Sequence, residues 1–418
     1  MSLFLRNATF VDGDASGLTR GDFAVEVGPG GGVAAVDAIP AGAEVVDCDG
    51  KLVTRAFAIA HHHLYSVLAR GMPAPPRTPE SFREILELVW WRLDRALDGE
   101  MILASARAGA LEAALSGCTF VVDHHSSPTA VEGSLALLAQ GLEEVGLGHL
   151  LCYELSDRDG PTSSAAGLAE SERHLREHPG LVGLHASFTV GDELLERAVG
   201  LARDQGTGLH VHLAEARSDP EHCRATHGVG PVERFARAGV LDSERSLLVH
   251  ALHLEEAERE RLAASPAWIV QCTESNQQNG VGSFDPAGLG EQILIGTDGM
   301  HSDPLRAARA SYLADCGLGR GSAAATLARL RSVDRYRALA TPGDAGTNDL
   351  VVLDYAPPTS VSADNWPAHL VHGLCSRHVR TVIRQGRVLV EDGQVLGVDA
   401  EAIRAHAREQ AARLWERL

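Results

Sequence analysis

Histidines lie in a few short segments of this sequence at spacings that favour metal chemistry. His61 and His63 are separated by one residue, and so are His210 and His212. Alternation along a β-strand would turn each pair toward one face of its strand. Imidazole nitrogens combined with one carboxylate are the ligands of a catalytic Zn²⁺ or Fe²⁺ ion, with a position left for water. The pattern therefore predicts a divalent metal site, with Zn²⁺ as the first expectation and Fe²⁺ as the alternative.

Further polar residues end apolar segments in the same manner. Glu215 follows His212 by three positions, His250 ends another apolar segment, and Asp298 stands in Gly296-Thr297-Asp298-Gly299. A single histidine at a strand end is more often a packed or hydrogen-bonded residue. Several histidine-bearing ends together with an acidic one are the pattern of a metal-dependent active site.

The elements that must position these residues are eight short apolar segments that mostly alternate with helical patterns. The expected strands are 57–63, 118–123, 149–154, 181–186, 208–213, 246–251, 267–272 and 292–297, and the clearest expected helices are 101–115, 192–205 and 231–238. Near-continuous apolar strands that alternate with helices imply a parallel sheet. Eight such units fit an α/β fold of the (β/α)8 TIM-barrel type, whose active site lies at the carboxyl ends of the strands.

The two ends of the chain have a different pattern. Short β segments at 3–11 and 23–27, with a turn expected at Asp12-Gly13, are matched by segments at 349–354 and 379–390. Glycine-rich turns between such segments are typical of hairpins. We expect a small β-sandwich domain from residues 1–53 plus 345–396, a barrel from 54–344 and a C-terminal helix from 397–418.

Composition narrows the function classes. The chain has 418 residues with 37 basic and 56 acidic side chains, a formal charge of −19 that argues against nucleic acid as a partner. No apolar run is long enough to cross a bilayer and no secretory leader is visible, so we expect a cytoplasmic protein without a membrane partner. The seven cysteines contain no C-x-x-C pair, which predicts free thiols.

The motif set resembles a known family. H-x-H at 61–63, H-x-x-E at 212–215, His250 and G-T-D-G at 296–299 are similar to the amidohydrolase superfamily, in its cytosine-deaminase-like and chlorohydrolase (ATZ/TRZ) branch. Segments 90–98, 122–125, 275–276 and 296–303 are most similar to SsnA-type aminohydrolases. The resemblance covers essentially the whole chain and implies a metal-dependent hydrolase.

The resemblance also implies roles for residues. The implied metal ligands are His61, His63, His212 and Asp298. His250 would orient the attacking water, Asp298 would accept its proton, and Glu215 would protonate the ring nitrogen or leaving group. Many members bridge two metals with a carboxylated lysine of strand four, but Lys51 is the only lysine and precedes the barrel. We therefore expect one metal.

Substrate contacts are the least determined part of the prediction. The candidates are His185, Trp90, His125 and Asn276. His185 could instead be a core histidine, and His125 could be a packing residue. Trp90 and Trp91 are adjacent on an expected helix and should not share a face, so at most one should reach the substrate.

The expected reaction is hydrolytic deamination of a purine, pyrimidine or related ring. Glu215 favours it, because a deaminase must protonate the ring before ammonia leaves. Hydrolysis of a cyclic amide, or a dechlorination-type displacement at the same site, is the alternative. A non-catalytic binding barrel is disfavoured because every expected ligand and Glu215 are present. The expected partners are a small heterocyclic substrate and, from the resemblance, further copies of the chain in a homodimer or larger homo-oligomer.

Overall fold

A closed parallel barrel forms the centre of the molecule. The computed structural model describes residues 2–11 and 18–418. The barrel strands are β6 (Phe57–His63), β7 (Cys118–His125), β8 (Gly148–Leu155), β9 (Val182–Ala186), β10 (Leu209–Leu213), β11 (Leu247–His250), β12 (Trp268–Gln271), β13 (Ile293–Ile295) and β14 (Asp298–Gly299). They pair in sequence order from β6 to β13, and β14 pairs with β6. The predicted TIM-barrel fold is confirmed, with its eighth strand divided into β13 and β14.

The division of the eighth strand results from its change of partner. The Gly296 N–H donates to the carbonyl oxygen of Gln271 at 3.0 Å, and the next N–H, of Thr297, donates to that of His61 at 3.1 Å. A Cβ at Gly296 would lie 2.9 Å from the Cβ of His61 and 3.0 Å from Cys272 Sγ. Only glycine permits this close approach, which carries Asp298 beside the histidines of β6.

Helices surround the barrel, and the predicted ones are present. They include α3 (Gly99–Leu115), α4 (Ser134–Val145), α5 (Pro161–Glu177), α6 (Asp192–Asp204), α7 (Ser218–His227), α8 (Pro231–Ala238), α9 (Glu256–Ala263), α10 (Thr273–Gln278), α11 (Pro304–Gly317), α12 (Ala323–Ala340) and α13 (Trp366–His372). Asp98 caps α3 by accepting from the Met101 N–H at 3.1 Å, and Gly146 ends α4 in the left-handed conformation. Within the described ranges, no helix combines the length and hydropathy that a membrane crossing needs.

Both ends of the chain contribute to a second sheet. Its strands are β1 (Ser2–Val11), β2 (Leu18–Glu26), β3 (Val33–Val36), β4 (Val45–Asp47), β5 (Leu52–Arg55), β15 (Leu350–Leu353), β16 (Val379–Arg384), β17 (Arg387–Glu391) and β18 (Gln394–Val395). Antiparallel pairing of β5 with β15 joins the two ends. The predicted pairing of the chain ends is confirmed, and the strands are hydrogen bonded in one continuous sheet. The predicted turn at Asp12-Gly13 lies outside the described residues.

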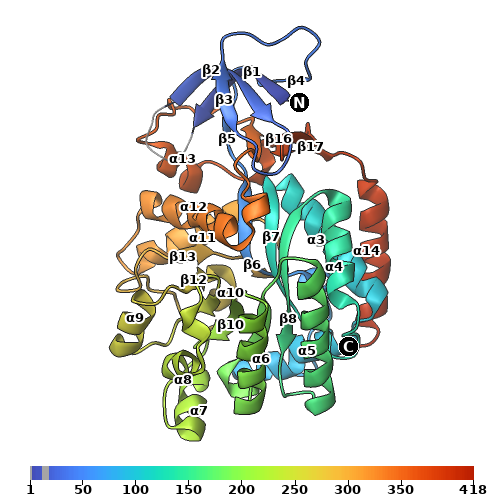
Figure 1. Cartoon of the computed structure of the whole chain (residues 1–418), viewed down its shortest axis with the longest axis vertical. Helices are drawn as coiled ribbons and strands as arrows, with labels where there is room; N and C mark the ends of the chain where they lie inside the picture. The colour runs from blue at the N-terminus through green and yellow to red at the C-terminus, as the bar shows by residue number, and fades with distance from the viewer. Residues whose placement is uncertain (1, 12–17) are drawn as a thin grey trace.

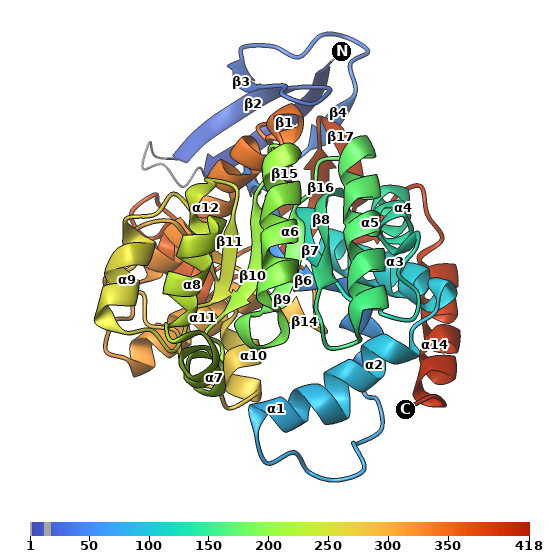
Figure 2. The ribbon, with the colours of Figure 1, turned by 60° about the horizontal axis from the view of Figure 1, so that its bottom comes forward.

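The two ends of the barrel are covered differently. The second sheet lies at one end of the molecule (Figure 1). A segment made of α1 (Phe82–Ile85), the π-turn η2 (Leu86–Trp90) and α2 (Trp91–Ala96) lies across the other end, where the strands have their carboxyl ends (Figure 2). The C-terminal helix α14 (Ala400–Trp415) packs along α3, and Trp415 Nε1–H donates to the Leu68 carbonyl oxygen at 2.9 Å. The end of the chain therefore supports the loop that follows the first barrel strand.

Arg337 joins the barrel to the second sheet, and we expect its loss to destabilise the fold. It is 3 % exposed, donates to Asp349 Oδ2 at 2.8 Å and to the Asp344 carbonyl oxygen at 2.7 Å, and lies 4.5 Å from the Phe120 ring centroid. Arg337→Met would leave the buried carboxylate of Asp349 without its ion-pair partner, which costs about 3–5 kcal/mol. Denaturant unfolding would measure the loss. Arg335→Met, an exposed position on the same helix, should cost under about 1 kcal/mol; equal losses would contradict this role.

Candidate metal centre

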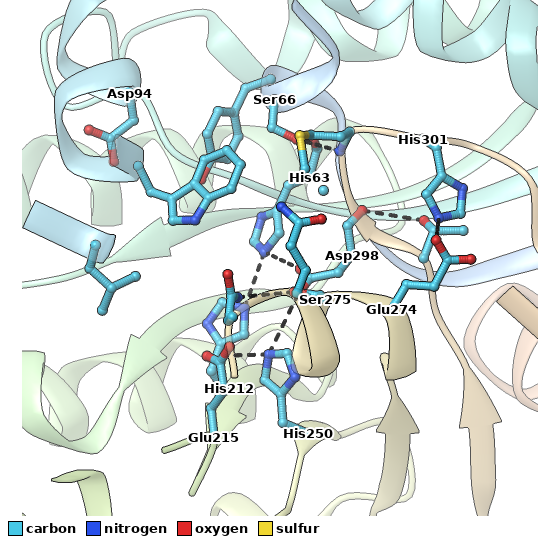
Figure 3. Close-up of a pocket in the computed structure, with 18 of the residues that line it drawn as sticks. His63, Ser66, Asp94, His212, Glu215, His250, Glu274, Ser275, Asp298 and His301 are labelled. Atoms are coloured by element: carbon cyan, nitrogen blue, oxygen red, sulfur yellow. Dashed lines mark hydrogen bonds and ion pairs between the residues drawn. The ribbon is translucent and has the colours of Figure 1, made fainter. Parts of the chain in front are cut away.

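Four potential ligands converge at the carboxyl ends of the barrel strands. Asp298 Oδ1 lies 3.2 Å from His61 Nε2 and 3.1 Å from His63 Nε2, and His63 Nε2 lies 3.2 Å from His212 Nε2. One ligand atom from each of the four residues lies within 4.8 Å of the others. Figure 3 shows His63, His212 and Asp298 turned toward one point. The structure thus brings together all four residues that the sequence predicted as ligands.

The spacing of these atoms suits a divalent metal. Zn–N bonds of about 2.0–2.1 Å at tetrahedral angles would separate neighbouring ligand atoms by about 3.3–3.4 Å. The observed separations of 3.1 to 3.2 Å are close to that value. All four residues are at most 9 % exposed, so their facing lone pairs would be unfavourable in the absence of a shared cation. The donor set, three imidazoles and one carboxylate, fits one divalent metal ion.

The second ring nitrogens of the ligands are also hydrogen bonded. The Nδ1 atoms of His63 and His212 lie 2.6 Å and 3.0 Å from the carbonyl oxygens of His124 and His185. A carbonyl accepts only, so both rings carry their proton on Nδ1. The Nε2 lone pairs are therefore free to face the metal.

Two titratable groups flank the ligands. His250 Nε2 lies 3.5 Å from Glu215 Oε2 and 4.0 Å from Asp298 Oδ2. Burial, reinforced by the charge of Asp298, raises the pKa of Glu215 well above its usual range. Burial lowers the pKa of His250. The site therefore places a carboxyl group whose pKa is raised beside an imidazole whose pKa is lowered, a combination suited to acid–base catalysis.

Strained backbone conformations gather at the same strand ends. Non-glycine residues with positive φ include Ala214 at 47°, His250 at 74°, Asp298 at 58° and Met300 at 74°. Such conformations cost about 1–3 kcal/mol each and persist where the surrounding structure imposes them. Here they turn the chain sharply after β10, β11 and β13, which presents Glu215, His250 and Asp298 to one cavity.

A cavity of about 210 Å³ opens over the ligands, with an aromatic wall supplied by the segment above it. Trp90 and Trp91 both line the cavity, although adjacent positions on a regular α-helix would not share a face. The reason is that Trp90 ends a π-turn, in which the Trp91 N–H donates to the Leu86 carbonyl oxygen. A π-turn advances by a smaller angle per residue than an α-helix, which brings adjacent side chains toward one face.

Of the other predicted substrate contacts, His185 lines the cavity and His125 does not. His185 lines the cavity, its Nδ1 lies 2.6 Å from Thr189 Oγ1, and burial lowers its pKa to about 4. His125 differs from the expectation, because it is fully buried outside the cavity with its Nε2 2.9 Å from Ser127 Oγ. Alternation along β7 explains this, since the preceding residue His124 takes the inward position.

Asn276 also lies behind the cavity wall and not in it. Its side chain is fully buried, and Oδ1 lies 2.8 Å from His250 Nδ1. It touches His250 and thereby holds the imidazole whose other nitrogen faces Glu215 and Asp298. The Ser275-Asn276 motif identified Asn276 as a candidate. The sequence did not show that its partner is His250 of β11.

Removal of the Asn276 amide should impair turnover through His250. Asn276→Leu keeps the approximate volume and removes the partner of His250 Nδ1, so the imidazole loses its orientation. We expect kcat to fall about 10–100-fold with a change in KM below about threefold, by the usual cost of removing an outer partner of a catalytic group. Steady-state kinetics would test this. An equal rise in KM with unchanged kcat would show that Asn276 acts on substrate binding.

Sequence reasoning missed a buried charged group on one side of the cavity. Asp94 and Glu154 line the cavity, and Arg158 bonds to Asp94 and lies 3.9 Å from Glu154 Oε1. Glu154 is the penultimate residue of β8 and a polar residue after an apolar run, so it carries the same sequence signal as the histidines at the other strand ends. Asp94 and Arg158 carry no such signal, because they meet only after helix α2 folds over the barrel.

Comparisons with known proteins agree with this geometry. The Amidohydrolase family profile matches residues 56–389. The 5-methylthioadenosine/S-adenosylhomocysteine deaminase of Pelotomaculum thermopropionicum is 30 % identical over 403 residues, covering 89 % of this chain and 88 % of that protein.

Solved structures share the fold over nearly the full length. A zinc-bound adenosine deaminase from Xanthomonas campestris has a TM-score of 0.83 at 21 % identity and covers 99 % of this chain and 98 % of its own. The zinc complex of atrazine chlorohydrolase from Arthrobacter aurescens has a TM-score of 0.79 at 19 % identity and covers 98 % and 100 %. The profile match and the full-length relatives show that this chain belongs to the amidohydrolase family.

Proposed function

We propose that the protein is a hydrolytic deaminase that uses one divalent metal, most simply Zn²⁺, to release ammonia from an amino-substituted purine or a related ring. The proposed ligands are His61, His63, His212 and Asp298. The observation that carries the proposal is Glu215 beside this ligand set, 3.5 Å from His250 Nε2 and with its pKa raised well above its usual range by burial. A deaminase needs such an acid, because a ring amine leaves only after the ring has been protonated.

In the proposed reaction the metal activates water, and the protein side chains transfer the protons. The metal, when bound, lowers the pKa of a water molecule toward neutrality and makes it nucleophilic. His250 Nε2 and Asp298 Oδ2 lie 4.0 Å apart on one side of the ligand set, where they can orient that water and take its proton. Glu215 faces His250 at 3.5 Å and donates its proton to the ring nitrogen next to the attacked carbon. The proton held by Asp298 then leaves with the departing ammonia. The hydroxyl proton of the ring adduct passes to Glu215, which forms the ring carbonyl and restores the acid.

The cavity walls support a flat heteroaromatic substrate. Trp90, Trp91, Phe82 and Leu86 supply an apolar wall on one side. Aromatic side chains favour planar rings through stacking and apolar burial. The relatives named as deaminases of adenosine derivatives favour a 6-aminopurine nucleoside within this class.

An ammonia-release assay on the zinc-loaded protein would test the proposal. The panel would hold adenosine, 5-methylthioadenosine, S-adenosylhomocysteine, guanine, cytosine and a chlorinated triazine. We expect ammonia from at least one adenine nucleoside, with one ammonia released for each amine lost from the ring. Release of chloride without ammonia would favour displacement chemistry, and a fully zinc-loaded protein that releases ammonia from none of the rings would overturn the proposal.

A further inference from the structure

The three ligand histidines are oriented in two different ways. For His63 and His212 the partner of Nδ1 is a backbone carbonyl oxygen, which no substitution removes. For His61 the partner is a side chain, because its Nδ1 lies 2.8 Å from His210 Nε2. The hydrogen bond of His61 is therefore the one among the three that depends on the identity of another residue.

We propose that His210 is a positioning residue of the metal centre, which holds His61 in the only tautomer that can ligate. If His61 offers the Nε2 lone pair to the metal, its proton is on Nδ1 and must be donated to His210 Nε2. If His210 instead carried its proton on Nε2, that proton would face His61 Nδ1. His61 would then be protonated on Nε2, 3.2 Å from Asp298 Oδ1, with no lone pair for the metal.

The residues around His210 stabilise the tautomer that carries its proton on Nδ1. Because Nε2 must accept, the ring proton is on Nδ1, which lies 3.5 Å from Cys152 Sγ. The same sulfur lies 3.5 Å from the carbonyl oxygen of Asp123, which can accept the S–H. Donation thus runs in one direction, from His61 to His210, to Cys152 and to the backbone of β7. Both His210 and Cys152 are fully buried, so water does not replace either partner.

The spacing in β10 explains why one strand supplies both a ligand and its support. His210 and His212 point to the same side of the strand, one layer apart in the barrel interior. His212 occupies the layer of the metal, and His210 lies in the layer below, with its ring centroid 4.9 Å from that of His61. His210 Nε2 faces the far nitrogen of the His61 ring, so His210 supports the ligand and is not a fifth ligand.

The test measures Zn²⁺ affinity by competition with a chromophoric chelator on the full-length protein. His210→Met fills a similar volume without the acceptor that His61 needs, and we expect zinc to bind about 10–100-fold more weakly. His210→Gln retains an acceptor near the position of Nε2, and we expect its affinity within about threefold of wild type. The ligand-field spectrum of the Co²⁺-substituted protein should change in the first variant and be restored in the second. Wild-type affinity in His210→Met, or equal losses in both variants, would overturn the proposal.

A second variant keeps the proposal testable if His210→Met does not fold. Cys152→Val removes the partner of His210 Nδ1, and we expect a smaller loss of zinc affinity, about 3–10-fold, while Cys152→Ser retains wild-type binding. Unchanged affinity in Cys152→Val would contradict the supporting role of the thiol. The inference rests on the proposed ligand set and not on the substrate. Zinc affinity is measured without substrate, so failure to release ammonia would leave this result standing.

Discussion

Glu215→Gln will bind zinc like the wild-type protein and will lose about 10²–10⁴-fold in kcat. Gln keeps the shape and polarity of the side chain but has no acidic proton to give to the ring. Burial first, and then the charge of Asp298, raises the pKa of Glu215 well above its usual range, which favours the protonated form that can act as the acid. Steady-state ammonia release, with the metal content measured on the same samples, would test this prediction.

The metal content and kcat of Glu215→Gln, beside a control variant, separate a proton donor from a structural residue at position 215. Glu221→Gln makes the same chemical change at an exposed position on α7 and should leave kcat unchanged. A fall in kcat of Glu215→Gln accompanied by full zinc occupancy supports the acid role. Wild-type kcat in Glu215→Gln would contradict the acid role. Loss of zinc from this variant would show that Glu215 helps to hold the metal.

His63→Ala will lose both the metal and the activity. The substitution removes an imidazole whose Nε2 lies 3.1 Å from Asp298 Oδ1 and 3.2 Å from His212 Nε2. Removal of a residue that is hydrogen bonded to a ligand weakens metal binding by about 10–100-fold. Removal of a ligand itself should therefore weaken metal binding by more than about 100-fold. Elemental analysis after dialysis, followed by kinetics, would measure both effects.

The neighbouring histidine supplies a matched control. His62 lies in the same three-histidine segment, but its Nε2 is 2.7 Å from Ser302 Oγ, behind the strand. His62→Gln should therefore bind zinc within about threefold of the wild-type affinity. Equal metal loss in the variants at 62 and 63 would show that the effect comes from damage to β6 and not from loss of a ligand.

The fold was predictable because its core strands carry local signals. A parallel strand buried on both faces is apolar along its length, so segments such as 118–123 and 246–251 stand out between helical patterns. The ligands were predictable for a related reason. A histidine or aspartate at the end of an apolar strand interrupts the hydrophobic pattern, and the barrel fold collects all such ends at one face.

The cavity wall was less predictable, because its contacts form between segments distant in sequence. The π-turn that brings both Trp90 and Trp91 to the cavity has no clear sequence signal. Arg158 reaches Asp94 only because α2 folds back over β8. His210 had the same spacing signal as His212, and only the register of neighbouring strands shows that one supports a ligand while the other faces the cavity.

The most direct test of the account is a zinc titration of the metal-free protein, followed by ammonia release from the best adenine nucleoside of the panel. We expect no turnover in the metal-free protein and a linear rise in activity that saturates at one zinc per chain. Saturation at two per chain would contradict the single-metal site built from His61, His63, His212 and Asp298. Full turnover in the metal-free protein would contradict the metal-dependent mechanism itself.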